Sequence, residues 1–540
     1  MNGNRAVARD PRLILLTAGT PAGTGPDVVG AKAAGLIQMA EAGLPVPHGF
    51  TLSTSVCGAY HARGRHLGED VITLVSQGIQ QLEHSTGKRF GGERRPLLVS
   101  VRAGAAISMP GMLDTILNVG LCDSTLPGLL RASGDPRFVW DSYRRLIEAY
   151  ADVVEGCERA PFASAVDEAM RRHEVPAVAE LDAAALRDLV GQLQEVYKSA
   201  AGQPFPQDPL QQLLGAVEAV MRSWNSARAV EYRRLKQLTE LTGTAVTVQA
   251  MVFGNVGMTS GSGVGFTRDP ATGEHRLYVD FLLNAQGEDV VAGRFATGDP
   301  DTLIAAIPGL AGELQDVSRT LEAIFTDAQD FEFTVEDGKL WLLQTRTAKR
   351  TPWAALQIAC DLVTEGLVDT TTGCRRLSDY DLDQISRVRL APGLDVKPIG
   401  SGTPASAGVA AGHVALTVEA ARQLAARGEA AILVRPEAST DDISALAVCR
   451  GLLTAAGART SHAAVVAREL GVACLVGCPT LAVDPAAGTL TIGDWHGHTD
   501  DSITIDGASG QIYADLLELV EERPADLIAR VRGWQPEGPD

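Results

Sequence analysis

The spacing of hydrophobic and polar positions changes several times along the chain. From residue 28 to 121, short apolar runs alternate with Gly-rich turns, which predicts strands and loops with little uninterrupted helix. From residue 135 to 238, apolar residues recur every three and four positions, as in FVWDSYRRLIEAYADVV, which predicts amphipathic helices. Strand patterns return in TAVTVQAMVF, HRLYVDFLL, FEFTV and KLWLLQTR and end near Arg350. The pattern therefore predicts a mixed domain that is interrupted by a block of helices.

A second compact unit is predicted after a connecting segment. Residues 351–400 have a helical pattern, and several Pro and Gly residues near its end indicate a flexible boundary. From about Gly402, short strand-like runs such as AAILVR, GLLTA and TLTI alternate with the helical runs AARQLAARG and HAAVVAREL. We expect a small β/α domain that ends near Leu516, followed by a tail over 517–540.

Composition narrows the class of protein. A chain of 540 residues is too long for one hydrophobic core, so we expect about two to four domains. The net charge of -19 and the lack of a Lys/Arg block argue against nucleic acid as a partner. No apolar stretch is long enough to span a bilayer. We therefore expect a cytoplasmic protein without a role in the membrane. The eight scattered cysteines are interpreted as reduced core residues.

The strongest local signal is GARTSHAAVVAREL, which places His462 at the start of a predicted amphipathic helix. A neutral imidazole is a competent nucleophile towards phosphorus, and helix N-terminal amides would stabilise the attached phosphoryl group. Thr460 or Ser461 can cap the helix. Taken alone, a single His in a Ser/Thr turn is more often a capping or packing residue.

This segment resembles the phosphohistidine signature shared by pyruvate phosphate dikinase, phosphoenolpyruvate synthase and rifampin phosphotransferase. Further segments are similar to pyruvate phosphate dikinase in the same order, among them PLLVSVRAGAAISMPGMLDTILNVGL, DSYRRLIEAYADVV, VTVQAMVFGN, FLLNAQGEDVVAG and DGKLWLLQTRTAKRT. The resemblance implies an α/β multidomain protein with an ATP-grasp nucleotide-binding domain and a swivelling β/α phosphohistidine domain. The implied domains are an ATP-grasp domain at 1–350 with a helical insertion at about 130–240, a helical linker at 351–400, the phosphohistidine domain at 401–516 and a tail at 517–540.

The resemblance also implies the cations of the ATP site. Lys32 of GAKAAGL and Arg102 of VSVRAG would contact the phosphates beneath a Gly-rich loop around Gly104 to Gly111. Thr460 matches the threonine that a regulatory kinase modifies in some dikinases, while helix capping alone is a sufficient role for it.

Two alternating pairs lie in the last strands of the first domain. Asp330 and Glu332 alternate in QDFEFTV, so both carboxylates face one side of a strand, as a shared metal site requires. Gln344 and Arg346 alternate likewise in LLQTR. Family likeness implies that the first pair binds Mg²⁺ and that the second contacts phosphate. Seen without the resemblance, such strands fit exposed polar alternation equally well.

The implied function is that of an ATP-dependent phosphotransferase of the dikinase type. ATP would phosphorylate His462, with Mg²⁺ as cofactor and inorganic phosphate as second substrate, giving AMP and pyrophosphate; water in place of phosphate stays open. Dikinases of this family continue into a C-terminal (β/α)₈ barrel of about 250 residues that binds pyruvate and phosphoenolpyruvate. Only a short segment follows Leu516, so we expect the phosphoryl group to pass to pyruvate on a separate barrel protein, or to another acceptor.

Two other functions and one assembly are left open at this stage. The chain would be a non-catalytic nucleotide-sensing or regulatory subunit if its ATP site were damaged, or an antibiotic-type small-molecule phosphotransferase. A homodimer is also left open. Two further motifs have a structural alternative. The GSGVG run at 261–265 either approaches the nucleotide or forms a hairpin turn, and the hairpin is favoured, while DWHGHTDD at 494–501 is interpreted as a loop rather than a metal site.

Overall fold

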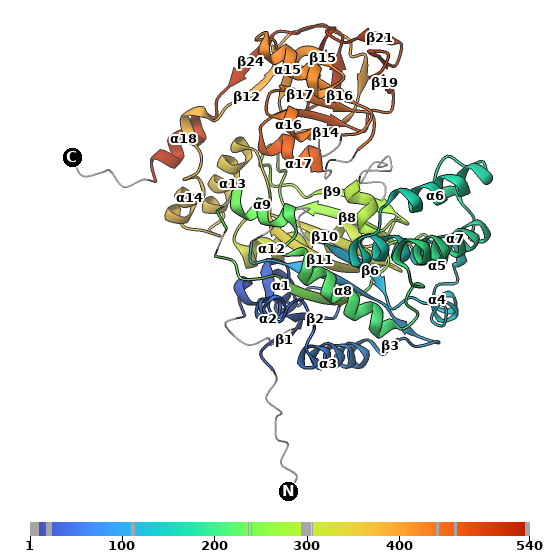
Figure 1. The fold of residues 1–540 in the computed structure, drawn as a ribbon. Helices are drawn as coiled ribbons and strands as arrows, with labels where there is room; N and C mark the ends of the chain where they lie inside the picture. Colours follow the sequence, from blue (N-terminus) through green and yellow to red (C-terminus); the bar gives the residue numbers. More distant parts are fainter. Residues whose placement is uncertain are drawn as a thin grey trace. The chain divides into compact units, whose positions relative to one another are not determined.

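The computed structural model of the chain divides into two compact units (Figure 1). Unit 1 comprises residues 1–257 and 341–344, and unit 2 comprises residues 258–340 and 345–540. The structure describes residues 10–17, 24–107, 109, 114–235, 237–238, 240–292, 304, 306–438, 442–457, 459 and 462–534.

The centre of unit 1 is a five-stranded antiparallel sheet in the order β1-β2-β7-β5-β6. Its strands are short and almost wholly buried, since helices cover them, and Phe50, Val101 and Val248 have no exposed surface. The strands are β1 Leu13–Leu15, β2 Gly49–Leu52, β5 Val99–Gly104, β6 Thr115–Val119 and β7 Ala245–Ala250. A small ribbon of β3 Arg89–Phe90 and β4 Pro96–Leu97 accompanies the sheet.

Three helices lie in the segment 28–121, where the prediction of little uninterrupted helix is wrong. They are α1 Pro26–Glu41, α2 Thr54–Ala62 and α3 Glu69–Thr86. Helix α3 buries Val71, Leu74, Val75, Ile79 and Leu82, which is helical spacing. Gly and Ala residues within these segments resemble turn composition, but here they let helix backbones approach the sheet closely.

The predicted helical block at 135–238 is confirmed. Helix α5 starts at an aspartate cap, with the Asp135 carboxylate accepting a bond of 3.0 Å from the Phe138 amide, and α7 and α8 are capped in the same way by Asp182 and Asp208. The block consists of α4 Leu126–Ser133, α5 Pro136–Tyr150 with a π-helical turn at Ala151–Glu155, α6 Ala160–Arg172, α7 Ala183–Ala201, α8 Pro209–Ser223 and α9 Ala227–Leu235.

Unit 2 begins with strands β8 Gly261–Phe266, β9 Tyr278–Leu283, β10 Gln329–Glu336 and β11 Lys339–Thr347, in the sheet order β11-β10-β8-β9. Residues 341–344 of β11 are counted with unit 1. Helices α10 Gly287–Ala292 and α12 Leu310–Phe325 follow β9. The predicted hairpin turn at 261–265 is wrong, because this run is strand β8. Its glycines leave room for aromatic rings: a Cβ on Gly265 would lie 2.3 Å from Phe331 Cζ.

The connecting segment contains the predicted helices, α13 Pro352–Thr364 and α14 Thr370–Arg376, and also strand β12 Arg387–Leu390. This strand pairs antiparallel with β24 Leu519–Glu522, and α18 Ala525–Arg532 follows. Helix α18 buries Ile528 and Val531 in one cluster with residues of α13. Part of the predicted tail at 517–540 is therefore ordered structure, formed because its apolar residues pack on the connector; residues 535–540 lie outside the described part.

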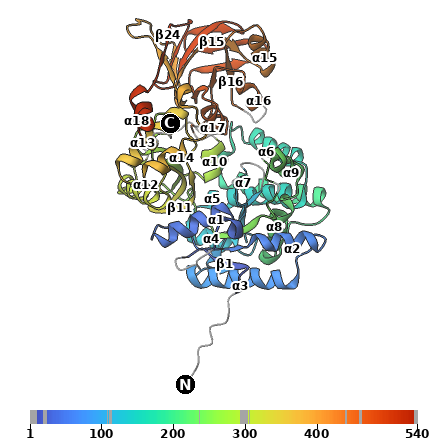
Figure 2. The same ribbon diagram turned by 90° about the vertical axis from the view of Figure 1, so that its left-hand side faces the viewer.

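The C-terminal part of unit 2 is an eight-stranded sheet, β13-β23-β22-β15-β16-β17-β18-β14, whose central strands β15 to β18 are parallel. Its strands are β13 Gly400–Ser401, β14 Thr403–Ser406, β15 Val409–Ala415, β16 Ala431–Arg435, β17 Gly451–Thr454, β18 Ala473–Val476, β22 Ser502–Asp506 and β23 Gln511–Tyr513. Helices α15 Val418–Ala426, α16 Ile443–Leu446 and α17 His462–Glu469 share one apolar cluster with these strands (Figure 2).

A three-stranded antiparallel sheet, β19 Leu481–Asp484, β20 Thr489–Ile492 and β21 Trp495–His498, precedes β22. DWHGHTDD is thus partly a strand, not the predicted loop, because the Trp495 to His498 backbone pairs with β20.

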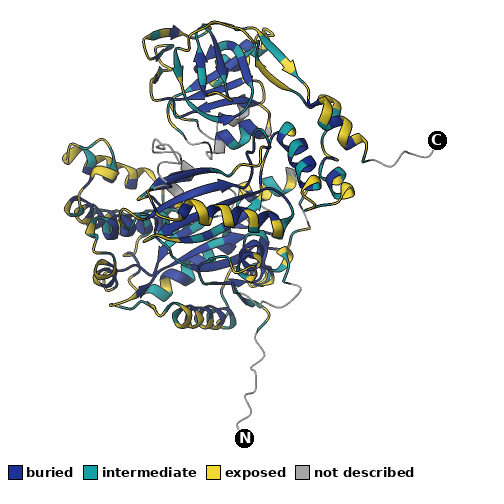
Figure 3. Ribbon diagram, turned by 180° about the vertical axis from the view of Figure 1, so that it is seen from behind, coloured by how far each residue is buried: buried dark blue, intermediate teal, exposed yellow. Residues whose placement is uncertain are grey.

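Buried strands and exposed helix faces are seen in Figure 3. All eight cysteines are free, and Cys474 and Cys478 are buried. Across the described part of the chain, no helix has both the length and the hydrophobicity to cross a bilayer.

Candidate functional site

Lys32 is held beside the end of strand β5 by a break in helix α1. Gly30 has non-helical backbone angles (φ 79°, ψ 154°), and the Ala31 amide donates a hydrogen bond of 2.8 Å to the Ala105 carbonyl. A Cβ at Gly30 would lie 2.2 Å from the Gly104 carbonyl oxygen. The segment around Lys32 therefore packs backbone to backbone against the end of β5, which is possible only with glycine at position 30.

We expect Gly30→Ala to lower the free energy of unfolding by about 3 kcal/mol, because it adds backbone strain and a clash. Gly134→Ala is the matched control, since Gly134 also has a positive φ of 66° but its added Cβ would meet nothing within 4 Å. Denaturant unfolding of both variants checks the difference. Equal losses in the two proteins would contradict the tight approach.

Arg102 and Gly104 lie on strand β5, whose end packs against the segment that contains Lys32. The Arg102 side chain is half-buried, and its Nε is buried without a hydrogen-bond partner among the described residues. The Gly104 amide donates a bond of 3.1 Å to Thr244 Oγ1. An unsatisfied buried donor is costly unless a ligand accepts its hydrogen bond, and phosphate oxygen is such an acceptor. Gly111, the other predicted glycine of this loop, lies outside the described residues.

Strand β10 presents Asp330 and Glu332 on one face, as the alternation predicts. Asp330 is 3% exposed, and Arg346 Nε on β11 donates to both of its carboxylate oxygens at 2.8 Å. Glu332 is half-buried. Gln344, on the same strand as Arg346, is buried at 7% exposure. Unit 1 thus holds Lys32, Arg102, Gly104 and Gln344, and unit 2 holds Asp330, Glu332, Arg346 and His462.

The two carboxylates fit magnesium in their chemistry, because Mg²⁺ prefers oxygen ligands and binds through one or two carboxylates plus phosphate and water. No group of three or more His, Cys, Asp or Glu side chains that could hold a metal occurs in the described part of the chain. A magnesium ion at Asp330 and Glu332 would therefore complete its shell with phosphate oxygens and water.

Burial raises the pKa of Asp330 to about 6, although Arg346 opposes the shift. A raised carboxylate pKa means that the folded state binds the proton more tightly than the unfolded state. The contribution of Asp330 to stability is therefore greatest at pH values below the ordinary pKa of an aspartate, and it is lost as the pH rises through about 6. Between pH 4 and 7, this titration should lower the free energy of unfolding by about 3 kcal/mol, and we expect Asp330→Asn to remove that decrease. Denaturant unfolding at several pH values measures this, and an unchanged slope in the variant would contradict it.

His462 is the first residue of helix α17, as the capping pattern predicts. Its side chain and the residues Thr460 and Ser461 lie outside the described part, so the predicted roles of these residues stay predictions. Arg468, in the last turn of α17, is 1% exposed. Its Nη2 donates to the Ala405 carbonyl at 2.6 Å and to the Arg459 carbonyl at 3.2 Å. The segment before His462 is thereby tied to the helix that follows it.

Arg459, three residues before His462, contacts strand β9, and sequence reasoning missed this contact. Its guanidinium lies 4.7 Å above the Tyr278 ring, and its Nε is 3.4 Å from Asp280 Oδ1. Neither Asp280 oxygen has a hydrogen-bond partner among the described residues, so Arg459 and Asp280 form an ion pair without an aligned hydrogen bond. Asp280 is 1% exposed, and burial raises its pKa to about 6 despite Arg459. Tyr278 also donates from its hydroxyl to the Pro404 carbonyl at 3.1 Å.

Two buried charged residues of this region, Arg468 and Asp280, carried a sequence signal. Arg468 follows Ala464 by four positions, so it falls on the apolar side of α17, where an arginine requires buried acceptors. Asp280 had a weaker signal, an acidic residue inside the apolar run YVDFLL. Neither signal identifies a partner.

Comparison with known proteins identifies two matching domains. The sequence model of the pyruvate phosphate dikinase AMP/ATP-binding domain matches residues 65–311, and that of the PEP-utilising enzyme mobile domain matches residues 428–510. Pyruvate, phosphate dikinase of Clostridium symbiosum is 44% identical over 515 residues, which is 94% of this chain and 58% of that protein. The Rhizobium meliloti enzyme is 42% identical, again over 94% of this chain and 58% of its own length. The chloroplastic enzyme 1 of Arabidopsis thaliana is 44% identical over 90% of this chain and 50% of its own.

The chain therefore spans 50% to 58% of the length of these relatives, each of which is named a pyruvate, phosphate dikinase. The matches do not bear out the expectation that a C-terminal barrel is missing and supplied by a separate protein, because the relatives are single chains. They also give no support to the non-catalytic subunit or to the antibiotic-type phosphotransferase.

Proposed function

Since these matches support the pyruvate phosphate dikinase family for this chain, we propose that it transfers a phosphoryl group from ATP to His462, as the first half of a dikinase reaction that ends on pyruvate. The observation that carries the proposal is that this chain is 44% identical to a pyruvate, phosphate dikinase over 94% of its length and contains Lys32, Arg102, Asp330, Glu332, Arg346 and His462. We further propose that residues 1–350 adopt an ATP-grasp fold and that the domain at 401–516 swivels to deliver the group.

In this proposal Lys32 and Arg102 bind ATP phosphates, and the unsatisfied Nε of Arg102 supports that role. Asp330 and Glu332 hold Mg²⁺, which would neutralise charge on the phosphates when bound. Arg346 keeps the Asp330 carboxylate oriented through its two bonds of 2.8 Å and adds a further positive charge for phosphate. Gly104 and Gly111 belong to the loop that approaches the nucleotide, and Gln344 contacts it. Thr460 caps the helix that begins at His462, and its regulation stays a prediction.

Helix α17 stabilises the phosphorylated histidine in this scheme. The first amides of a helix have no intrahelical acceptor, and the helix dipole favours negative charge at that end. The helix dipole would therefore favour a phosphoryl group on the first residue of α17. Arg468 donates to the Arg459 carbonyl and so ties Arg459 to α17.

Atom balance identifies which phosphate stays on the protein. If the products are AMP and pyrophosphate, AMP keeps the α-phosphorus, and pyrophosphate combines the γ-phosphoryl group with the added inorganic phosphate. The β-phosphoryl group then remains on the His462 ring nitrogen, and the N–P bond replaces the P–O bond to AMP. With water as second substrate the γ-group leaves as phosphate, and the β-group still remains. A simple kinase would instead place the γ-group on the protein and release ADP.

Incubation of the protein with β- or γ-labelled ATP, Mg²⁺ and phosphate tests the proposal. We expect label from β-labelled ATP only, stable in alkali and lost in acid, with AMP as nucleotide product. Pyrophosphate that appears only when phosphate is added identifies phosphate as the second substrate. Transfer of the γ-label with ADP formation, or absence of label from either nucleotide, would overturn the proposal.

A further inference from the structure

The helical block of unit 1 contains a pocket that has no part in the proposed reaction. Its volume is about 500 Å³, and its walls are helices α4, α5 and α7, which lie together in Figure 1. Pockets that hold small molecules have volumes of roughly 300 to 1,000 Å³, whereas protein partners need a broad surface. The size favours a small organic molecule as occupant.

One end of the pocket carries a negative charge with a fixed orientation. Tyr143 is fully buried, and its hydroxyl donates to Asp123 Oδ1 at 2.9 Å while it accepts bonds of 3.0 Å from Gln194 and Gln207. Burial raises the pKa of Tyr143, so it stays a phenol and keeps donating. Asp123 is exposed, and its Oδ2 has no hydrogen-bond partner among the described residues. That oxygen is an acceptor for a positively charged donor.

The middle of the pocket is apolar. Leu130 is 39% exposed and is one of the large hydrophobic residues left uncovered, and the half-buried Trp140 adds an aromatic wall. Gly191 lies on the α7 wall, and a Cβ added there would meet nothing within 4 Å. The space above Gly191 is thus open, and an apolar ring would cover the exposed surfaces of Leu130 and Trp140.

Arg187 lines the other end of the pocket; its side chain is 62% exposed, and its Nε lies 3.5 Å from Asp188 Oδ1 in an exposed ion pair that water screens. Arg187, Gly191 and Gln194 are spaced four and three residues apart on α7, so they follow one face of the helix. Seven residues of helix separate Arg187 from Gln194 by about 10 Å along the axis. Gln194 and Asp123 both hydrogen-bond the Tyr143 hydroxyl, so Asp123 lies at the Gln194 end of the pocket. The pocket therefore has a carboxylate at one end and an arginine about 10 Å along α7 from Gln194.

From this arrangement we propose that the pocket between α4, α5 and α7 binds a small zwitterion, in which an ammonium group and a carboxylate are joined by an apolar aromatic body. The ammonium group pairs with Asp123, the carboxylate pairs with Arg187, and the ring lies against Leu130 and Trp140. The site is independent of ATP and of His462.

The probe for the test is para-(aminomethyl)phenylpropanoate, whose two charges are separated by an aromatic ring. Saturation-transfer NMR on the full chain at about 2 mM probe should show saturable binding. Two analogues that each lack one charge, para-methylphenylpropanoate and para-propylbenzylamine, should bind about tenfold more weakly.

Three variants locate the binding. Gly191→Leu fills the pocket without disturbing the helix, because leucine is a better helix former than glycine, and it should abolish binding. Asp123→Asn should weaken binding about tenfold, whereas Asp167→Asn, an exposed aspartate of α6 outside the pocket, should leave it unchanged. Absence of probe binding, or binding that survives Gly191→Leu in the folded protein, would overturn the proposal.

Discussion

Protein with His462→Ala is expected to take up no label from β-labelled ATP, a fall of about a thousandfold or more, while its unfolding curve stays close to that of the wild type. The imidazole is the proposed acceptor of the phosphoryl group, and alanine has no atom that can replace it. His462 lies at the start of α17, and the buried residues of that helix are mainly alanines and Arg468, which the substitution leaves in place. Label on alkali-quenched protein, counted after gel separation at alkaline pH, measures the effect.

The control is His496→Ala, which removes an exposed histidine of strand β21 in the same unit. This variant should keep full labelling, because no phosphate chemistry is assigned to it. Label that survives in His462→Ala but disappears in His496→Ala would contradict the prediction, because it would make His496 the residue that carries the phosphoryl group. AMP release should stop with the label, since the two products of the proposed step form together.

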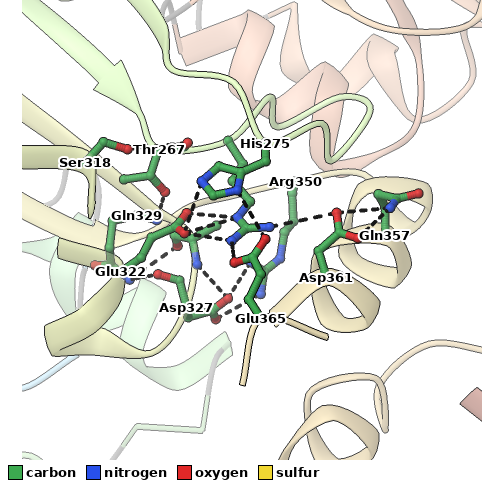
Figure 4. A network of polar contacts seen from close by, with 12 residues as sticks. Thr267, His275, Ser318, Glu322, Asp327, Gln329, Arg350, Gln357, Asp361 and Glu365 are labelled. Atoms are coloured by element: carbon green, nitrogen blue, oxygen red, sulfur yellow. Dashed lines mark hydrogen bonds and ion pairs between the residues drawn. The ribbon is translucent and has the colours of Figure 1, made fainter. Parts of the chain in front are cut away.

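Arg268→Leu is expected to lower the free energy of unfolding by about 3–5 kcal/mol, the second large effect. Arg268 is fully buried and bonds Glu322 of α12 at 2.9 and 2.8 Å, and it also bonds Glu365 at the end of α13 at 2.6 Å. Glu322 and Glu365 are labelled in Figure 4. Glu322 is 4% exposed, and its other charged neighbour among the described residues is the half-exposed His275, so loss of the guanidinium leaves a buried carboxylate with a weak partner. Denaturant unfolding measures the loss.

Two comparisons make this prediction specific. Arg427→Leu removes an arginine that is 50% exposed and pairs with Glu429, and it should change stability far less because water screens that pair. The double variant Arg268→Leu with Glu322→Leu should regain part of the loss, since it removes the stranded carboxylate. A loss in Arg268→Leu no larger than in Arg427→Leu would show that Glu322 finds another partner or a proton.

Sequence reasoning succeeded where one side of an element is buried. The helices of 135–238 and the strands that contain Asp330 and Gln344 have a clear period, because burial on one face repeats every 3.6 or two residues. It failed at α1 and at β8, where glycines resemble turn residues. In α1 Gly30 permits contact with the Gly104 carbonyl, and in β8 Gly265 makes room for the ring of Phe331. A single glycine has no side chain whose period could reveal such a contact.

By itself, the sequence determined the order of elements over most of the chain and the set of residue types for phosphoryl transfer. The order of elements follows from the local spacing of apolar residues, and the residue types for phosphoryl transfer follow from the sequence motifs and their family resemblance. Only the tertiary structure decided which charges meet. Arg268 pairs with Glu322 and Glu365, which are 54 and 97 residues away along the chain, and Arg459 reaches Asp280. Such pairs depend on how strands and helices pack, and the spacing of residues along the chain contains no record of that packing.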